Sequence, residues 1–513
     1  MEPADLYCQE LQTTPQPQLG KILVTGATGY VGGRLVPELL ARGYYVRVMV
    51  RALSSELRDR WPEVEIVLGD ALDPESLLPA LKGVHTAYYL IHSLLGGHER
   101  FEDLDIQAAE NFRKAADLQK VSRIIYLGAL GDVQSDLSTH LRSRQDVSRE
   151  LKRGSAKVTS LRAAVIIGSG SASFEVMAHL ARRLPVILLP SWAQTRCQPI
   201  AIRNVIAYLV GALESPETAG VSYDIGGPDI LSYQEMLQTF ADVFGLRRLY
   251  IRLPVYNLRV TSYLVSLLTP GAHSVVHCLL ESAVNNVVCQ NNDILDIVRI
   301  KRLPYREAVL RALSREDQDR VHTRWSDAYP PAHELMMKLA EMPPEKLYTK
   351  SAGLISAKSP GALFSSICRV GGRHGWFHTN WLWRLRGSLD KILMGVGTSR
   401  GRRDPRSLRV NDVVDFWRVE DIVPERRLLL RAEMKLPGRA WLEFRLDPEP
   451  PDGNRLTVRA YYEPSGFWGK MYWYAVYPLH AFIFRDLIEQ IERSSSDGSD
   501  DTEPPEGTPI PRA

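Results

Sequence analysis

Three glycines near the start of the chain have a spacing that suits phosphate binding. Gly26, Gly29 and Gly32 stand in ILVTGATGYVGGRLVPELLARG, between a strand-like run and a helix-like run. Glycine permits a tight turn and lets backbone amides approach a pyrophosphate, while the N-terminus of the next helix supplies positive partial charge. The motif predicts a dinucleotide site rather than a purely structural turn. Its expected contacts are Gly26, Thr28, Gly29, Tyr30, Val31 and Gly32.

The ends of the next two strand-like runs indicate which dinucleotide is bound. Arg51 ends YYVRVMVR, where an NAD site would offer an acid to the ribose, and no acid occurs between Glu38 and Glu56. Arginine can pair with a 2′-phosphate, so NADP(H) is favoured over NAD(H), although Arg51 as a solvated strand end remains the alternative. After VEIVLGD, Asp70 and Ala71 are placed to meet the adenine.

A histidine and an arginine four positions apart follow the fifth strand-like run, in STHLRSRQ. Residues four apart share one face of a helix, so His140 and Arg144 would act together. An unperturbed histidine titrates at about pH 6.5, and His140 could therefore donate a proton to a carbonyl that is being reduced. Arg144 could hold a ribose hydroxyl or a phosphate. The alternative is that both are exposed at the start of a surface helix.

Three other side chains are candidates for proton transfer or cofactor contact. His92 follows the fourth strand in YYLIHS, where the strand ends of an open α/β sheet face the cofactor. It is either a cofactor-side residue or a structural histidine. Tyr89 and Tyr126 lie within strand-like runs, and Tyr126 is as compatible with the core as with the cleft.

The elements that position these residues alternate between short apolar runs and helical stretches. This order predicts a Rossmann-type, doubly wound parallel sheet over residues 20–235, after a flexible leader at 1–19. Residues 236–345 are expected to form a mostly helical, substrate-side extension. Within it, residues 260–280 lack charge but contain Pro270-Gly271, which favours two packed helices over a membrane span. Peripheral membrane contact stays open.

The last part of the chain has antiparallel patterning. Residues 346–494 are predicted to form an α+β domain closed by a long helix from Pro478 to about Ser494, and the acidic tail 495–513 is expected to be disordered. Seven of the ten tryptophans lie here, and they form either an aromatic core or the wall of an apolar ligand cavity. The seven are Trp376, Trp381, Trp383, Trp417, Trp441, Trp468 and Trp473.

The net charge and the cysteine spacing limit the kinds of partner that the sequence predicts. A formal charge of +3 gives no footprint for nucleic acid, and five scattered cysteines indicate no metal site and a reducing, cytoplasmic compartment. The cluster RGRRDPR at residues 400–406, with Arg384, Arg386 and Lys391 nearby, could clamp an anionic group, although a solvated face is the default.

The first 230 residues resemble the atypical branch of the short-chain dehydrogenase/reductase superfamily, which includes NmrA-like and complex I 39-kDa-subunit-like proteins. The resemblance rests on TGATGYVG, GDALDPESLLPAL and LRAAVIIGSGSASFE. Active members of the superfamily carry a serine after the fifth strand and Tyr-x-x-x-Lys in the next helix, and here His140 and Arg144 stand at the tyrosine and lysine positions. The resemblance also implies a substrate-side position for Gln198, which could equally satisfy a loop. Segments such as GWFHTNWLWRLRGSLDKILMGVG and AEMKLPGRAWLEF resemble an uncharacterised bacterial domain similar to START-like helix-grip folds, which enclose apolar ligands.

Two functions follow from these patterns. One is an NADP-dependent oxidoreductase acting on an apolar carbonyl, quinone or isoprenoid-type compound, and the sequence leans toward this enzyme. Its cofactor carries the hydride chemistry, so the loss of Tyr and Lys does not forbid it. The other is a non-catalytic NADP(H)-binding redox sensor or assembly factor. The oligomeric state is not indicated by the sequence.

Overall fold

The structure is a computed structural model of the chain. It describes residues 6–51, 55–92, 101–131, 137–253, 257–269, 273–317, 339–371, 375–376, 380–393, 395–397, 407–450 and 453–495.

The N-terminal part is built around a seven-stranded parallel sheet in the order β11-β6-β5-β4-β1-β2-β3. The chain runs outward from β1 to β3 on one side and from β4 to β11 on the other, so β1 and β4 meet at the switch point where such sheets bind ligands. This confirms the predicted doubly wound sheet. The strands are β1 (Lys21–Thr25), β2 (Val46–Val50), β3 (Glu65–Leu68), β4 (Val84–Tyr89), β5 (Arg123–Ala129), β6 (Lys157–Ala163) and β11 (Ser222–Ile225).

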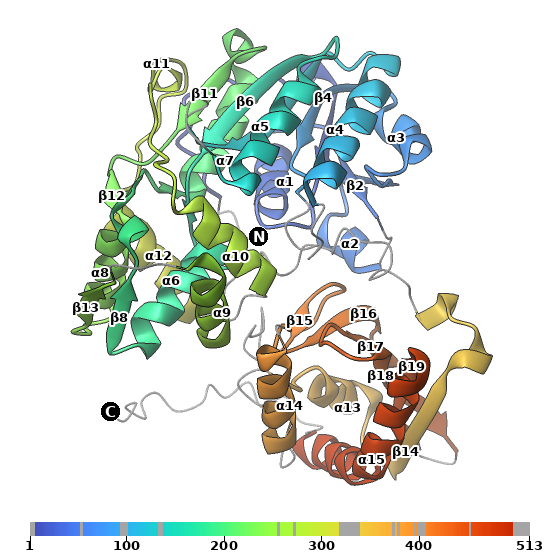
Figure 1. Cartoon of the computed structure of the whole chain (residues 1–513). Helices are drawn as coiled ribbons and strands as arrows, with labels where there is room; N and C mark the ends of the chain where they lie inside the picture. The colour runs from blue at the N-terminus through green and yellow to red at the C-terminus, as the bar shows by residue number, and fades with distance from the viewer. Residues whose placement is uncertain are drawn as a thin grey trace.

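Helices cover both faces of this sheet (Figure 1). α3, α4 and α5 pack side by side on one face, and α1 packs with α7 on the other. The two faces bury separate apolar clusters, because the strands alternate their side chains between the two sides. The helices are α1 (Gly32–Ala41), α2 (Ser55–Arg60), α3 (Pro74–Leu81), α4 (Phe101–Leu118), α5 (Thr139–Leu151) and α7 (Ile202–Glu214).

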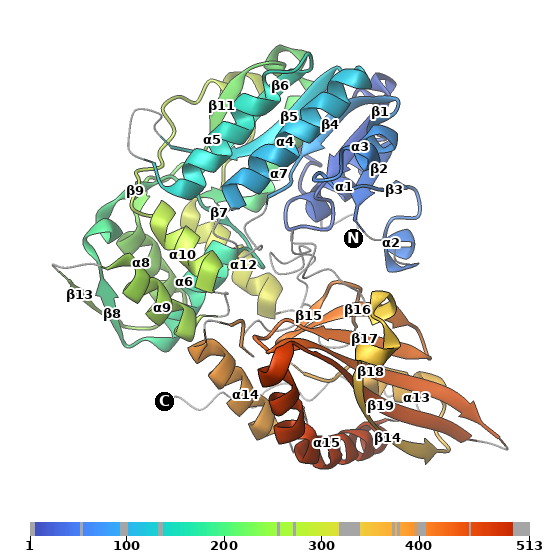
Figure 2. The same cartoon turned by 45° about the vertical axis from the view of Figure 1, so that its right-hand side comes forward.

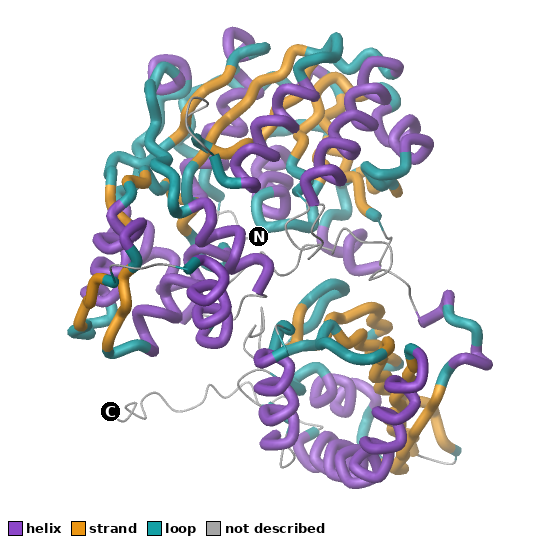
Figure 3. Tube along the Cα trace, in the orientation of Figure 1, coloured by secondary structure: helices purple, strands orange, loops and turns teal. Residues whose placement is uncertain are grey.

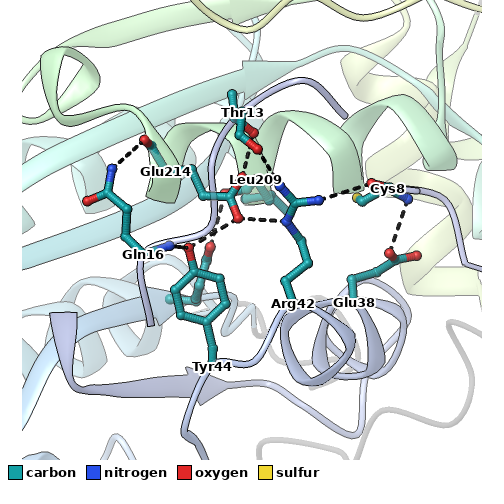
Figure 4. Close-up of polar contacts among 9 residues, drawn as sticks. Cys8, Thr13, Gln16, Glu38, Arg42, Tyr44, Leu209 and Glu214 are labelled. Carbon is teal, nitrogen blue, oxygen red and sulfur yellow. Dashed lines mark hydrogen bonds and ion pairs between the residues drawn. The ribbon is translucent and has the colours of Figure 1, made fainter. Parts of the chain in front are cut away.

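Residues 6–19 pack against this domain, which differs from the flexible leader expected at 1–19. The backbone amides of Tyr7 and Cys8 donate to the carboxylate of Glu38 on α1. Arg42 Nε lies 2.6 Å from Glu214 Oε1 at the end of α7 (Figure 4). Buried carboxylates need donors, and the leader and Arg42 supply them. The sequence pattern gave no sign of this anchoring.

A lobe made mostly of helices is built from residues 166–201, before β11, and from residues after β11. α9 (Leu258–Leu268) and α10 (His273–Ser282) pack together as the prediction of two packed helices requires. No helix in the described part of the chain is both long and apolar enough to cross a membrane. The other elements of the lobe are β7 (Ile166–Ile167), α6 (Ala172–Arg183), β8 (Val186–Leu189), β9 (Arg196–Cys197), β10 (Ile200–Ala201), β12 (Leu231–Ser232), α8 (Tyr233–Val243), β13 (Leu249–Arg252), α11 (Ile294–Ile297) and α12 (Tyr305–Asp317).

The C-terminal part is a separate antiparallel sheet of six strands in the order β14-β19-β18-β17-β16-β15. Figure 3 shows these strands as one layer with helices gathered beside it. The resemblance to helix-grip folds stays a prediction. The strands are β14 (Tyr348–Ser356), β15 (Val413–Val414), β16 (Trp417–Val423), β17 (Arg427–Ala432), β18 (Gly438–Glu449) and β19 (Gly453–Pro464), and the helices are α13 (Pro360–Ile367), α14 (Asn380–Ile392) and α15 (Gly466–Ser494).

The terminal helix begins earlier than predicted. The expected start at Pro478 is wrong, because α15 begins at Gly466 and contains Pro478 in its interior. Proline at the first turn of a helix is common, which made Pro478 look like a start, but an interior proline removes one backbone hydrogen bond and bends the helix. Figure 2 shows α15 as two differently directed segments. The tail beyond Ser495 lies outside the described residues.

Two contacts join α14 to the helical lobe. Lys391 Nζ is buried and donates to the carbonyl oxygens of Ser266, at 2.8 Å, and of Thr269. Tyr263 Oη donates to the carbonyl of Ile392 at 3.2 Å. A lysine at the C-terminus of α9 also interacts favourably with the negative end of that helix. The C-terminal domain is thus attached to α9 through a buried cation and a tyrosine hydroxyl.

Candidate functional site

The glycine turn has the shape that a pyrophosphate needs. Gly26 has φ +64°, and a Cβ there would lie 2.7 Å from the carbonyl oxygen of Leu90. A Cβ on Gly32 would lie 2.3 Å from the carbonyl oxygen of Gly26. No side chain among the described residues caps the N-terminus of α1. The backbone amides of Gly33 and Arg34 donate to the carbonyls of Gly29 and Val31, and the close approaches that only glycine allows give the turn a shape that fits a dinucleotide.

A buried arginine that the sequence reading missed holds this turn in place. The guanidinium of Arg34 lies 4.2 Å from the ring centroid of Tyr30. It donates from Nη1 to the carbonyl of Tyr30 at 3.1 Å and from Nη2 to the carbonyl of Ser169 at 2.9 Å. Arg34 thus ties the β1–α1 turn to the segment after β7. A charged residue on the buried stripe of GGRLVPELLA was the available signal.

The predicted nucleotide residues gather at one edge of the sheet. Arg51 directly follows β2, and Asp70 and Ala71 follow β3, so both positions lie at the edge that carries the glycine turn. Asp70 Oδ1 accepts from the amide of Leu72 at 3.0 Å, and the carbonyl of Ala71 accepts from Asn111 Nδ2 at 3.0 Å. These bonds fix the loop after β3. Contacts of these residues with a cofactor stay a prediction.

His92 and His140 meet at the same edge. His92 follows β4, beside β1, and His140 lies in the first turn of α5, which Ser138 caps by accepting from the amide of Leu141. Their Nε2 atoms are 3.1 Å apart, and their ring centroids are 5.1 Å apart. The two histidines singled out separately by the sequence therefore form one hydrogen-bonded pair.

The pair is extended at both ends by residues that the sequence reading did not find. His92 Nδ1 lies 3.1 Å from Oδ2 of the buried Asp105 on α4, and His140 Nδ1 lies 3.0 Å from Ser282 Oγ at the end of α10. The result is a continuous chain from Asp105 through His92 and His140 to Ser282, which we call the histidine chain. Asp105 shares one face of α4 with the buried Ala109 and Phe112, and an acid on a buried stripe was a usable signal.

The hydrogen bonds of the histidine chain fix its tautomers. A carboxylate only accepts, so His92 carries its proton on Nδ1 and its Nε2 accepts from His140 Nε2–H. His140 Nδ1 then accepts from the hydroxyl of Ser282. Ser282 Oγ also lies 2.9 Å from the carbonyl of Cys278, so its proton can turn toward either acceptor. Every bond of the chain is satisfied with both rings neutral.

Burial keeps both rings neutral at physiological pH. The pKa of His140 lies well below its usual value because of burial first, and then because of His92 and the Arg144 charge. Burial and Arg144 also lower the pKa of His92, while its hydrogen bond to Asp105 acts in the opposite direction. Burial therefore makes each ring less basic than an exposed histidine.

Arg144 is a buried framing residue in this structure. Its guanidinium donates to the carbonyl of Leu127 and, at 3.3 Å, to the carbonyl of Ile91, at the ends of the strand runs β5 and β4. Tyr126 Oη donates in turn to the carbonyl of Arg144 at 2.9 Å. The alternative of an exposed His and Arg pair is wrong, because Arg144 is buried and both residues are hydrogen-bonded.

Two further candidates are occupied in the core. Tyr126 is fully buried, and so is Tyr89, whose ring packs edge-on against Phe112 at 5.0 Å. Gln198 is buried, donates to the carbonyl of Gly227 at 2.8 Å and accepts from the amide of Cys289 at 3.0 Å. Gln198 therefore satisfies loop backbone, which was the alternative to a substrate-side role.

The C-terminal domain contains an apolar cavity of about 170 Å³ between its sheet and α14 and α15. The tryptophans contribute both to an aromatic core and to the wall of this cavity, and binding of an apolar ligand there stays a prediction. Trp376 and Trp417 belong to the apolar core, and Trp383, Trp417, Trp441 and Trp473 line the cavity. A cavity of about 150 Å³ can hold a benzene-sized molecule.

Three nitrogen atoms of cavity-lining residues lack a hydrogen-bond partner. Nε1 of Trp383, Nε1 of Trp417 and Nδ1 of His480 are buried and bond to nothing in the described part of the chain. Buried polar atoms are usually paired, and each unpaired one calls for an explanation. Burial lowers the pKa of His480 to about 4, so its ring is neutral at physiological pH.

The predicted anion clamp is only partly covered by the structure. Residues 400–406 lie outside the described residues. Arg386 Nη2 donates to the carbonyl of Lys435 at 2.7 Å, and Lys391 is committed to α9. Arg384 is exposed. No group of histidines, cysteines and acids suited to a metal ion occurs within the described ranges.

Comparisons with known families match the two parts separately. Residues 26–166 match a family described as NAD(P)H-binding, and residues 349–487 match one described as Protein of unknown function (DUF2867). Over 240 residues, the chain is 29% identical to a ceramide reductase of Caulobacter vibrioides, covering 46% of this chain and 74% of that protein.

Two further relatives match the same N-terminal region. A mitochondrial NADH dehydrogenase [ubiquinone] 1 alpha subcomplex subunit 9 of Arabidopsis thaliana is 26% identical over 242 residues, covering 45% of this chain and 60% of that protein. A chloroplastic divinyl chlorophyllide a 8-vinyl-reductase of Zea mays is 26% identical over 250 residues, covering 46% and 62%. The chain thus spans less than two thirds of these two relatives. The glycine turn, the sheet order and these matches together show that the N-terminal part is an NAD(P)-binding Rossmann domain of the atypical short-chain dehydrogenase/reductase, NmrA-like type, and that a separate DUF2867 domain follows it.

Proposed function

We propose that this protein is an NADP-dependent oxidoreductase that reduces a carbonyl group of an apolar substrate and supplies the proton through the histidine chain. The observation that carries the proposal is the 3.1 Å contact between His92 and His140. It lies where β4 ends beside β1, which is the edge at which open α/β sheets bind their ligands. A pair of neutral imidazoles at that edge is a proton path placed beside the expected nicotinamide.

The roles of the residues follow from this placement. A bound nicotinamide supplies the hydride to the carbonyl carbon. When the cofactor is bound, the glycine turn would hold the pyrophosphate and Arg51 would pair with the 2′-phosphate. The carbonyl oxygen takes one proton as the hydride arrives, and His140 is the residue that donates it. The pair draws that proton from water, and the Asp105 carboxylate offsets its positive charge while it is held.

Support for an apolar substrate comes from two directions. The ceramide reductase and the divinyl chlorophyllide reductase are named for apolar substrates, which favours a substrate of that class here. The cavity of the C-terminal domain is lined mostly by apolar and aromatic side chains, and such a lining favours an apolar ligand. We propose that this domain holds a small apolar ligand with one hydrogen-bond acceptor, which the indole N–H groups of Trp383 and Trp417 would meet.

The main test is turnover by the full chain with NADPH and a panel of long-chain ketones, aldehydes and quinones, followed by absorbance of the reduced nicotinamide. His140→Gln removes the proton donor and should lower turnover by about 100-fold or more, with NADPH binding unchanged. His85→Gln is the matched control, since His85 is a half-buried histidine on β4 that bonds Thr86. Its turnover should equal that of the unmodified chain.

The cofactor preference has its own test. Arg51→Glu places a negative charge where the 2′-phosphate is expected, so the NADPH-over-NADH affinity ratio should fall by about tenfold or more. Arg58→Glu, at an exposed position on α2, should leave the ratio unchanged. An unchanged ratio in the Arg51 variant would contradict the role given to that arginine.

The second candidate function is a non-catalytic NADP(H)-binding sensor or assembly factor. One observation favours it: both ring nitrogens of His140 already have partners, and a substrate must displace Ser282 or His92 to reach one. Tight NADPH binding with no turnover on any member of the panel would favour this function over the reductase.

Ligand binding by the cavity is tested separately through tryptophan fluorescence. A medium-chain methyl ketone should bind more tightly than the alkane of equal length, because only the ketone can accept from the indole groups. Equal affinities would contradict the polar role of Trp383 and Trp417.

A further inference from the structure

Helix α14 carries an apolar stripe on its exposed side. Trp381, Leu385, Leu389 and Ile392 recur at intervals of three and four residues and are 49% to 61% exposed. Such spacing places them on one face of the helix. An amphipathic helix of a soluble domain normally turns this face toward the core, and here it faces outward in the part of the chain that the structure describes.

Helix α15 continues the exposed apolar surface. Phe467, Trp468, Tyr474 and Phe482 are 62% to 73% exposed, and Met471 lies among them on the same segment. Single exposed apolar residues are ordinary, but a concentration of large aromatic side chains marks an interaction site. Tryptophan and tyrosine are also the residues that concentrate at membrane–water interfaces.

The two helices lie next to each other. Trp383 and Arg386 of α14 and Tyr472 and Val476 of α15 line the same cavity. Figures 1 and 2 both show α14 and α15 as neighbours at one end of the C-terminal domain. We call the outward sides of these helices, over residues 381–392 and 467–482, the docking face.

The charges around the docking face are positive. From Gly466 to Phe484, α15 contains the exposed Lys470 and no carboxylate, and the next charged side chain, Arg485, pairs with Glu489 at 3.1 Å. On α14, Arg384 is exposed, and the helix's single carboxylate, that of Asp390, is fully buried. A surface of aromatic residues with lysine and arginine and without exposed acids complements an anionic lipid headgroup layer.

We propose that the docking face binds the surface of an anionic lipid bilayer, with its aromatic residues in the headgroup region and Lys470 and Arg384 near the phosphates. No described helix is long and apolar enough to span the bilayer, so this is attachment at the surface. The helices that touch the lipid also wall the cavity. A poorly soluble ligand can therefore reach the cavity without crossing water.

The experiment is sedimentation of the full chain with vesicles of phosphatidylcholine alone or of phosphatidylcholine with phosphatidylglycerol. The protein should sediment with the anionic vesicles, and high salt should release much of it, because the electrostatic attraction is screened. Trp468→Ser and Leu385→Glu should each weaken binding by about tenfold. The control is Leu118→Ser, which changes a leucine that is 71% exposed on α4 of the Rossmann domain, and it should bind normally.

A second pair of variants tests the charge. Lys470→Glu should weaken binding to anionic vesicles by about tenfold, whereas Lys82→Glu, at an exposed position after α3, should not. All variants change exposed residues, and retained NADPH binding with an unchanged far-UV spectrum confirms that they fold.

Three results would overturn the proposal. They are no sedimentation with anionic vesicles, sedimentation that the docking-face variants leave unchanged, and a dimer in analytical ultracentrifugation that Leu385→Glu dissociates. The last result would assign the face to a second copy of the chain. None of these outcomes depends on whether the Rossmann domain is an active reductase.

Discussion

The histidine chain and the tryptophan-lined cavity differ in whether their ring nitrogens have hydrogen-bond partners. All four ring nitrogens of His92 and His140 have hydrogen-bond partners, which run to Asp105 at one end and Ser282 at the other. In the cavity, three buried ring nitrogens, on Trp383, Trp417 and His480, have none within the described residues. The rings of His92 and His140 are partly buried, and the two regions differ in how their ring nitrogens are paired.

The difference indicates what each region is prepared to bind. A buried network in which every bond is satisfied holds its protons in defined places, and a proton can move along it without separating charges far apart. Unpaired buried donors cost stability until an acceptor arrives, and this cost is recovered on binding. We infer that the N-terminal region is suited to proton transfer and the C-terminal region to a ligand with an acceptor.

The largest predicted effect comes from reversing one bond of the histidine chain. Asp105→Asn keeps the shape of the side chain but can present an amide N–H to His92 Nδ1, which forces the opposite tautomer through the pair. Turnover should fall by about 100-fold or more with little change in NADPH affinity. The measurement is the pair of kinetic constants kcat and KM with NADPH. Turnover close to that of the unmodified chain would show that the tautomer is irrelevant.

The next prediction concerns how the free energy of unfolding depends on pH through His480, which lines the cavity. The folded pKa of His480 is about 4, below its unfolded value of 6.5, so the unfolded state binds the proton more tightly. Its contribution to the free energy of unfolding is complete above pH 6.5 and falls as the pH drops toward 4, by at most about 3 kcal/mol. His480→Phe removes this loss. The difference in Tm between the two proteins should therefore widen as the pH falls from 7 to 4, and a constant difference would refute the assignment.

The smallest predicted effect is a change in the free energy of unfolding at neutral pH when one histidine in each region is replaced by phenylalanine. His480→Phe replaces an unpaired ring that stacks on Phe484 at 5.1 Å, and it should stabilise the protein by about 1 kcal/mol. His92→Phe removes a partner from Asp105 and another from His140, and it should destabilise by about 1–3 kcal/mol. Urea unfolding of both variants gives the two signs. Equal signs would remove the distinction drawn between the regions.

Local patterns predicted much of the fold. The glycine turn and the parallel strands each depend on a few neighbouring residues, and the structure places them as expected. The extent of α15 could not be read in this way, because Pro478 has the same local signature at a helix start and inside a helix. Packing of α15 against β14 and β19 decided between the two.

The candidate site was predictable only in part. His92 and His140 could be chosen from their places after a strand and at a helix start, but their mutual contact depends on the sheet order. Asp105 and Ser282 come from α4 and from the end of α10, and no local spacing connects them to the histidines. The packing of Tyr7 and Cys8 against Glu38 was missed for the same reason.

The contact of His140 with Ser282 also bears on the order in which parts of the chain fold. The two residues are 142 positions apart, so the contact can form only after the helical lobe has docked on the sheet. Contacts of large sequence separation require closure of long loops and tend to form late in folding. A newly made chain that has completed only its sheet could already hold a nucleotide, but its proton path would still be open at one end. The ring of His140 would then be fixed by both of its partners only when assembly is finished.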